Sequence, residues 1–208
     1  MVERSKDILE GISIVLRLFE KAEAIIGIED NKPKAIDALS FECNGNNRIN
    51  VMPLSTRYPQ GGERRLISSV TGRQINSHIL PADAGVIVLN IATIIAIYEA
   101  VKMNMPLVHR VVTLTGDGVN EPGNMDVPLG ISHKYLADEC GGIKDSTVKI
   151  ISGGPMMGMA MNSLDYPVIK TSSSILAITH DDVEKMETSA CIRCGRCVAA
   201  CPETLVPQ

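Results

Sequence analysis

The sequence predicts an α/β fold in which part of a parallel sheet is followed by a small α+β unit and a cysteine-rich end. Three observations predict it. Residues 24–54 alternate strand, helix and strand, which is typical of a parallel sheet. Residues 108–165 contain short strands around one helix, as in α+β units. Four closely spaced cysteines then follow at residues 191–201.

The first elements are predicted by periodicity and by helix-start signals. Apolar residues recur at helical spacing over residues 6–25, with Ser5 as the expected cap. Residues 24–29 are short, apolar and β-branched, as a buried strand should be. The segment 30–33, Asp-Asn-Lys-Pro, predicts an Asx cap and a proline in the first turn of the next helix. Residues 48–54 supply the second strand.

A pair of glycines, Gly61 and Gly62, separates the strand ending near Leu54 from a helix expected over residues 63–70. Open α/β sheets bind ligands at the carboxyl ends of their strands. Glycines there let a cofactor ring or a phosphate approach backbone N–H groups at a helix start. The alternative for Gly-Gly before a helix is a plain turn. The sequence contains no G-x-G-x-x-G and no Walker motif.

An apolar run over residues 84–101 raises the question of a membrane span. Asn90, Thr93 and Glu99 interrupt the run. We therefore expect a buried strand over residues 85–89 and a core helix over 93–103, in a chain that does not itself cross a membrane.

The second unit is predicted from alternating strands and turn residues. We expect strands over 111–116 and 148–152, turns at 118 and 122–124, and a helix that Ser132 opens and glycines at 141–142 end. Four methionines (Met156, Met157, Met159 and Met161) are expected to fill the core flexibly rather than to bind copper. Residues 168–178 are expected to form a strand-like connector, and 181–188 a short charged helix.

The cysteine run has the spacing of a bacterial iron–sulfur segment, with a proline after the last cysteine. Gly195 is expected to let the backbone approach the sulfur atoms, because it has no Cβ. Arg193 and Arg196 favour thiolates over thiols. A zinc site or a disulfide pair is the alternative, but zinc sites use separated ligand pairs. The ligands expected to bind iron are Cys191, Cys194, Cys197 and Cys201.

This spacing also predicts that ligands are missing from the chain. In ferredoxins with two such runs, the fourth cysteine of each run binds the other cluster. Cys191, Cys194 and Cys197 would then share one cluster, and Cys201 would serve a second. We therefore expect the chain to be a fragment of a longer protein.

Composition excludes several other functions. The formal net charge of −4, aromatic content of 3% and absence of tryptophan argue against a nucleic-acid partner. The N-terminus has no apolar signal segment, and the cysteine usage indicates a reducing compartment. Cys43 and Cys140 are expected to be small buried hydrophobes. No catalytic residue is assigned, because there is no nucleophile elbow and the scattered histidines have no paired spacing (His78, His109, His133 and His180).

Several phrases, in order along the whole chain, resemble the C subunit of the Rnf electron-transport complex, a family related to the flavoprotein subunit of respiratory complex I. They are the cysteine run, Ile26-Gly-Ile-Glu-Asp-Asn-Lys32, Tyr58-Pro-Gln-Gly-Gly-Glu63, Leu80-Pro-Ala-Asp-Ala-Gly85, Asn90-Ile-Ala-Thr93, Arg110-Val-Val-Thr-Leu-Thr-Gly116 and Gly153-Gly-Pro-Met-Met-Gly158.

The resemblance implies three domains and their cofactors. Residues 1–107 would be part of a Rossmann-like flavin/NADH-binding domain, 108–165 an SLBB (soluble-ligand-binding β-grasp) domain, and 166–208 a connector with a truncated ferredoxin-like segment. It implies FMN, NAD(H) and, in the full-length protein, two [4Fe–4S] clusters. The implied partners are other Rnf subunits, NADH and, indirectly, ferredoxin. The implied location is peripheral, on the cytoplasmic side of a membrane complex that couples electron transfer to ion pumping.

The resemblance also assigns flavin-side residues. Tyr58, Gly61, Gly62 and Glu63 match the segment facing flavin and nicotinamide, and Asn90 and Thr93 match a second flavin-side segment. Glu29, Asp30 and Asn31 are further candidates. A turn, a helix cap or a buried hydrogen bond is the alternative for each.

Two departures from the family pattern lead us to expect weakened cofactor binding. The family's glycine-rich flavin loop would precede Met1, and its second cysteine run would follow Gln208. Two other functions stay open beside a role in the Rnf oxidoreductase. One is a soluble electron-transfer partner of an amino-acid reductase such as proline reductase, and the other is a scaffold module with degenerate cofactor sites.

Overall fold

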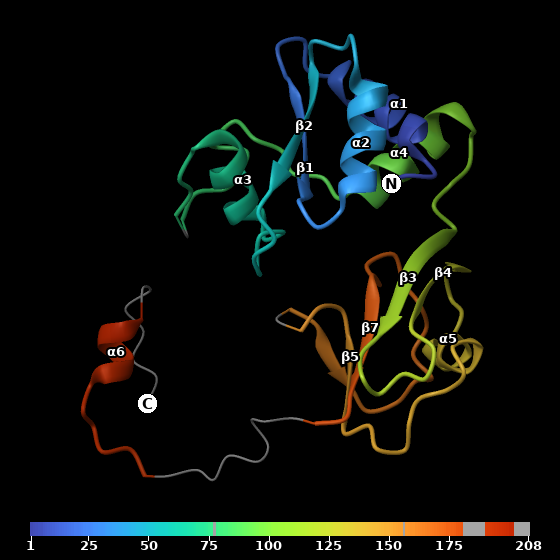
Figure 1. Cartoon of the computed structure of the whole chain (residues 1–208), viewed down its shortest axis with the longest axis vertical. Coiled ribbons are helices and arrows are strands. Elements are labelled where there is room, and N and C mark those ends of the chain that lie inside the picture. The colour runs from blue at the N-terminus through green and yellow to red at the C-terminus, as the bar shows by residue number, and fades with distance from the viewer. Residues whose placement is uncertain (77, 156, 181–189, 202–208) are drawn as a thin grey trace. The chain divides into compact units, whose positions relative to one another are not determined.

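The computed structural model describes residues 1–76, 78–155, 157–180 and 190–201 (Figure 1). Internal contacts divide the chain into two compact units, Met1–Leu107 and Val108–Gln208, and we describe each by itself. The first unit alternates helices and strands, and the second gathers most of the strands around a short helix. The mixed α/β class predicted from the sequence is confirmed.

The first unit contains the predicted strand–helix–strand alternation. β1 (Ala24–Glu29) and β2 (Ile49–Leu54) pair in parallel, with Glu29 opposite Leu54. α2 (Pro33–Cys43) connects them, and Pro33 suits its first turn because that N–H would have no partner within the helix. Because the strands are parallel, both end at the same edge of the sheet.

Close helix packing completes this unit. α1 (Ser5–Leu16) packs on α4 (Ile91–Lys102) at Gly11, where an added Cβ would lie 2.4 Å from the Ile94 carbonyl oxygen. α3 (Glu63–Thr71) packs on β1 at Gly27, where a Cβ would lie 2.9 Å from Leu66 Cδ1. The buried core consists of Ile8, Ile12, Leu16, Ile26, Ile28, Ala35, Leu39, Cys43, Ile49 and Ile94.

Expectations for this unit are wrong at its first helix and at residues 85–89. The first helix ends at Leu16 rather than near residue 25, and Arg4, not Ser5, is its N-cap. The Arg48 guanidinium binds the carbonyl oxygens of Leu16 and Phe19, so the chain turns away there. The strand expected over residues 85–89 does not form. The apolar run that starts at residue 84 begins instead in a turn closed by a hydrogen bond from the Val86 N–H to the Pro81 carbonyl oxygen (3.0 Å), and Ile87 is 58% exposed.

The second unit is a five-stranded sheet in the order β4-β3-β7-β5-β6. β3 pairs antiparallel with β4 and parallel with β7, while β5 pairs antiparallel with β7 and β6. The strands are β3 (His109–Thr115), β4 (Gly123–Pro128), β5 (Lys149–Ser152), β6 (Met159–Met161) and β7 (Ser174–Ile178). The buried core consists of Val112, Leu114, Val119, Val127, Leu136, Cys140, Val168, Ile175 and Ala177.

The helix of this unit, α5 (His133–Glu139), starts and stops where the sequence predicts. The Ser132 hydroxyl oxygen accepts a hydrogen bond from the Tyr135 N–H (3.3 Å), as an N-cap should. Gly141 and Gly142 follow with φ of 72° and 88°, a left-handed conformation that glycine adopts without a Cβ penalty.

The structure differs from the sequence prediction at three places in this unit. β4 covers residues 123–128, where turn residues were expected at 122–124, because Gly123 and Asn124 pair with β3. The prediction that the methionines fill the core is wrong for Met157 and Met159, which are 92% and 76% exposed beside and on the edge strand β6. Within the strand-like connector expected over 168–178, residues 174–178 do form a strand, but it is a central strand of the sheet. The domain boundaries at 107 and 165 stay predictions.

In the residues that the structure describes, no helix combines the length and the apolar character that crossing a membrane requires. Met156 and the charged helix expected over 181–188 lie outside the described residues. A short helix, α6 (Arg196–Ala200), occupies the cysteine run.

Candidate functional site

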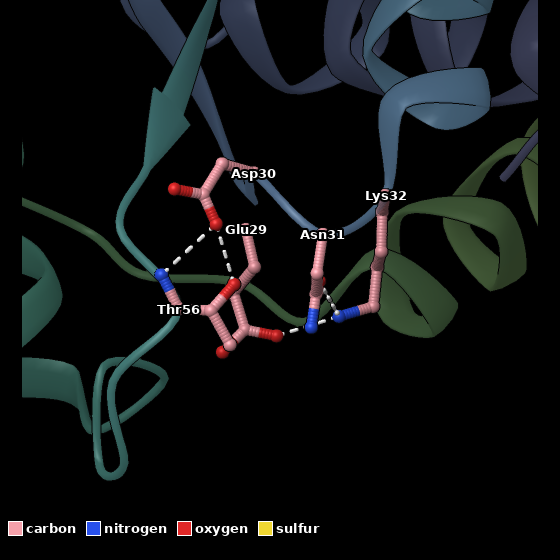
Figure 2. Close-up of polar contacts among 5 residues, drawn as sticks. All are labelled: Glu29, Asp30, Asn31, Lys32 and Thr56. Carbon is pink, nitrogen blue, oxygen red and sulfur yellow. Dashed lines mark hydrogen bonds and ion pairs between the residues drawn. The ribbon is translucent and has the colours of Figure 1, made fainter.

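The carboxyl ends of β1 and β2 carry a connected set of polar contacts (Figure 2). The Asp30 N–H donates to the Leu54 carbonyl oxygen (2.8 Å), which extends the ladder beyond β1. Asp30 Oδ1 accepts two hydrogen bonds from Thr56, one from its N–H (3.1 Å) and one from its hydroxyl (2.6 Å). These bonds hold the pKa of Asp30 below its ordinary value. Asp30 therefore ties β1 to the segment leaving β2 and does not cap α2, whose N-cap Lys32 has no side-chain hydrogen bond to the helix start.

The two neighbours of Asp30, Glu29 and Asn31, contact Lys32 and not Thr56. Lys32 Nζ lies 2.5 Å from Glu29 Oε2 and 3.0 Å from Asn31 Oδ1 (Figure 2). The Lys32 N–H also donates to the Glu29 carbonyl oxygen (3.0 Å), closing a turn at the start of α2. Of these polar residues, Asp30 is the one that links the two strand ends.

Residues 56–62, which we call the 56–62 loop, run from this link to α3. The Gln60 N–H donates to the Arg57 carbonyl oxygen (2.6 Å), and the Gly62 N–H to that of Pro59 (2.8 Å). Gln60 Nε2 donates to Ser69 Oγ on α3 (2.8 Å). The loop is therefore attached at its start by Thr56 and near its end by Gln60.

The loop presents the first group of predicted flavin-side residues to solvent. Tyr58 is 67% exposed. A Cβ on Gly61 would meet no atom within 4 Å, so the backbone there faces open space. Gly62 is the N-cap of α3 and Glu63 is its first residue. Within the described part of the chain, the Glu63 carboxylate has no hydrogen bond or ion pair, which leaves it available to a ligand.

The second predicted segment opens α4. Asn90 is its N-cap, and Asn90 Oδ1 accepts a hydrogen bond from the Ala92 N–H (2.9 Å). Thr93 is exposed in the first turn. The helix-cap alternative is thus correct for the Asn90 oxygen, and its amide nitrogen stays available to donate. Among the described residues, no hydrogen bond joins this segment to the 56–62 loop.

The cysteine run forms a turn followed by α6. Arg193 and Gly195 have left-handed φ of 55° and 72°. The Arg193 N–H donates to Cys191 Sγ (3.4 Å). The left-handed backbone at Gly195 suits a glycine, and a Cβ there would meet no atom within 4 Å, so its approach to cluster sulfurs stays a prediction. All of the cysteines are free thiols, so the disulfide alternative is not realised here.

The donor set of this run fits an iron–sulfur cluster. Among the described residues, no three His, Cys, Asp or Glu side chains gather as ligands, so the four cysteines stay predicted ligands. Three of them, Cys191, Cys194 and Cys197, are exposed. A backbone N–H directed at a cysteine sulfur is one means by which proteins tune such clusters. The run offers one continuous group of thiols rather than the separated pairs of a structural zinc site.

The remaining cysteines are buried, as the sequence predicts. Cys43 and Cys140 lie in the cores of the two units. Burial raises the pKa of both thiols, with nearby carboxylates adding to the effect. Both residues therefore belong to the packing of their units and not to a ligand set.

Comparison with known proteins finds three family models that match successive segments of the chain. The model of the Nuo51 FMN-binding domain matches residues 1–99, that of the SLBB domain residues 111–160, and that of the 4Fe-4S binding domain residues 185–203. The whole chain is 47% identical to the C subunit of the proton-translocating ferredoxin:NAD(+) oxidoreductase complex of Clostridium ljungdahlii. It is 39% identical over its whole length to the Na(+)-translocating counterpart of Acetobacterium woodii.

Over its whole length the chain is similar to Rnf C subunits. The C subunit of the ion-translocating oxidoreductase complex of Rhodobacter capsulatus is a further relative, 39% identical over the whole chain. The chain spans 45%, 47% and 40% of the lengths of these three Rnf proteins. The predicted order of flavin, SLBB and iron–sulfur domains in this family is confirmed by the order of the three matches.

Thr56 is the site residue that the sequence analysis missed. Its signal lies in the parallel pairing. Because Glu29 stands opposite Leu54, an Asp directly after one strand and a Thr shortly after the other leave the sheet side by side. The register makes their contact predictable once β1 and β2 are paired.

Proposed function

We propose that this chain is part of an electron-transfer subunit of a ferredoxin:NAD oxidoreductase complex that uses FMN, NAD(H) and [4Fe–4S] clusters. The observation that carries the proposal is the order of an FMN-binding, an SLBB and a 4Fe-4S match along one chain. When bound, FMN exchanges a hydride with NAD(H), and the clusters exchange single electrons. The chain supplies binding, orientation and electrostatics.

The 56–62 loop and the start of α3 support the flavin and nicotinamide part of the proposal. Tyr58 and Glu63 are exposed, and Gly61 borders open space. The N–H groups at the start of α3 carry partial positive charge, which favours an electron-rich ligand. In our proposal Gly61 and Gly62 admit the ligand to the backbone. Asn90 and Thr93 contribute from the start of α4.

The 191–201 segment supports the iron–sulfur part. We propose that Cys191, Cys194 and Cys197 bind one cluster and that Cys201 binds a second. Arg193 and Arg196 offset the negative charge of thiolates and cluster. The remaining ligands would come from residues outside this chain.

The partners and location follow from the relatives. Each is named as a subunit of an oxidoreductase complex that moves ions. We propose that this chain likewise assembles with other Rnf subunits and exchanges electrons with NADH directly and with ferredoxin indirectly. We further propose a peripheral position on the cytoplasmic side of the membrane, where NAD(H) is found.

The test is the cofactor content of the complete gene product prepared without oxygen. We expect bound FMN, iron and sulfide, and a low-temperature paramagnetic resonance signal on reduction with NADH. Cys194→Ser should lower iron and sulfide and weaken that signal. Cys140→Ala, which changes a buried thiol outside the run, should retain them. Zinc in place of iron, or no signal on reduction, would overturn the proposal.

A further inference from the structure

The ends of β1 and β2 are linked at the carboxyl edge of the sheet, and any role of this link in flavin binding rests on the proposed function. The parallel register places Glu29 opposite Leu54 at the carboxyl edge of the sheet. The Asp30 N–H continues the ladder by its hydrogen bond to the Leu54 carbonyl oxygen (2.8 Å). The backbone of Asp30 is therefore fixed by the sheet itself, before its side chain makes any contact.

The side chain of Asp30 then fixes Thr56. Both donors of Thr56, its N–H and its hydroxyl, are directed to the same carboxylate oxygen, at 3.1 and 2.6 Å (Figure 2). Two bonds to one residue restrain its backbone and its side-chain rotamer together, which one bond would not do. Bonds to an ionised acceptor are also stronger than bonds between neutral groups.

The neighbouring polar residues do not duplicate this link. Glu29 and Asn31 each contact Lys32, which belongs to the same segment between β1 and α2 (Figure 2). No hydrogen bond from either side chain to the 56–62 loop occurs among the described residues. Asp30 is thus the described side chain that attaches the start of the loop to β1.

The loop beyond Thr56 carries the proposed flavin-side residues. Tyr58 lies two positions on, and the successive turns at Arg57–Gln60 and Pro59–Gly62 lead to Glu63. The bond from Gln60 to Ser69 (2.8 Å) attaches the other end of the loop to α3. Releasing Thr56 would leave the loop attached at one end.

We propose that Asp30 is a positioning residue that, through Thr56, fixes the 56–62 loop against the end of β1 and so sets the affinity of this site for its flavin ligand. Asp30 acts on the ligand by way of the loop and does not contact it. A positioned loop is already ordered when the ligand arrives, so it loses less conformational entropy on binding.

The test is a mutant cycle read by two independent measurements. The first is amide hydrogen exchange over residues 56–62 in ligand-free protein. The second is the dissociation constant for FMN of the complete gene product stripped of flavin. The variants are Asp30→Ala, Thr56→Val, the double variant and Thr56→Ser, which keeps the hydroxyl. Asp37→Asn, an exposed carboxylate on α2, is the matched control.

We expect Asp30→Ala to speed exchange in the loop and to weaken FMN binding about tenfold. Thr56→Val should weaken FMN binding by less, because the N–H of residue 56 remains. The double variant should bind FMN no more weakly than Asp30→Ala alone. Thr56→Ser and Asp37→Asn should stay within about twofold of the unchanged protein.

Two results would overturn the inference. Additive effects of the two single variants on FMN affinity would mean that Asp30 touches the ligand itself. Faster loop exchange with an unchanged FMN affinity would mean that the link is structural only. If the unchanged protein binds no FMN, the proposed function fails, and unaltered exchange in Asp30→Ala would still reject the link separately.

Discussion

The Asp117 carboxylate accepts hydrogen bonds from both the backbone N–H and the hydroxyl of Thr179, the residue that follows β7. The bond to the N–H is 3.0 Å long. His180 Nδ1 lies 3.3 Å from the same carboxylate, and Lys144 Nζ donates to the Asp117 carbonyl oxygen (2.8 Å). The chain leaving β7 is therefore held to the connection between β3 and β4.

This contact predicts an acid-sensitive second unit. The bonds from Thr179 lower the pKa of Asp117, with a smaller effect of His180. A lowered folded-state pKa means that the stabilisation is complete above the unfolded-state pKa and is lost as pH falls through the folded-state value. Asp117→Asn should lower the Tm near neutral pH. It should also reduce the fall in Tm that accompanies acidification. Thermal unfolding between about pH 7 and about pH 3 measures both effects.

The matched control for that experiment is Asp145→Asn, an exposed carboxylate of the same unit. It should leave the Tm and its pH profile unchanged. If the Tm of Asp117→Asn fell as steeply with acidification as that of the unchanged chain, the prediction would be contradicted.

Gly11→Ala should destabilise the first unit although it places a better helix former in α1. Alanine in place of glycine in a helix contributes about 1 kcal/mol of stability. Here the Cβ would lie 2.4 Å from the Ile94 carbonyl oxygen and 2.8 Å from Ile94 Cγ2. Overpacking of this kind costs about 1–3 kcal/mol, so the clash should outweigh the propensity gain.

Urea unfolding measures the free energy of unfolding of Gly11→Ala. Gly61→Ala is the matched control, because its Cβ would meet no atom within 4 Å, and its stability should be nearly unchanged. A Gly11→Ala chain more stable than the unchanged one would show that α1 and α4 separate at little cost.

Arg48→Met should destabilise the first unit by removing a cation from the end of α1. The Arg48 guanidinium donates to the carbonyl oxygens of Leu16 (3.2 Å), Phe19 (2.6 Å) and Ala22 (2.8 Å). Leaving such acceptors without a donor costs about 1–3 kcal/mol. Arg48→Lys should recover only part of the loss, because an ammonium group lacks the planar fork of a guanidinium.

The control for Arg48 is Arg17→Met, which removes an exposed cation next to the same helix end. Its free energy of unfolding by urea should change little. Equal losses for Arg17→Met and Arg48→Met would attribute the effect to net charge and not to the carbonyl contacts.

The cysteines should separate into two classes by thiol reactivity. In the metal-free chain, the thiols of Cys191, Cys194, Cys197 and Cys201 should react rapidly with a disulfide reagent, because three are exposed and one is partly exposed. Cys43 and Cys140 should react at least about tenfold more slowly, since burial raises their pKa and blocks access. Denaturant should abolish the difference. Rapid labelling of Cys140 in the folded chain would contradict its placement in the core.

Local signals predicted much of the fold. The strand–helix–strand alternation, the helix that starts at Glu63 and the Ser132 cap all follow from residues close together in the chain. The exposed Gly61 and Glu63 at the start of α3 were also predictable, because the end of one parallel strand and the start of a helix fix their place.

Pairing between distant residues accounts for most of what the sequence did not predict. Gly123 and Asn124 have the composition of a turn, and β3 makes them a strand by supplying hydrogen-bond partners. Met159 lies on an edge strand, which the residues around it do not reveal. The Asp30–Thr56 link required the register of β1 against β2.

The position of β7 has a consequence for how the second unit forms during synthesis. β3 and β5 do not pair with each other, and β7 joins them although it is the last of the five strands to leave the ribosome. Until then the pairings available to a nascent chain are β3 with β4 and β5 with β6, and these two pairs share no ladder. The sheet is completed by insertion into its middle, so this unit must delay its folding until the chain has been translated past Ile178.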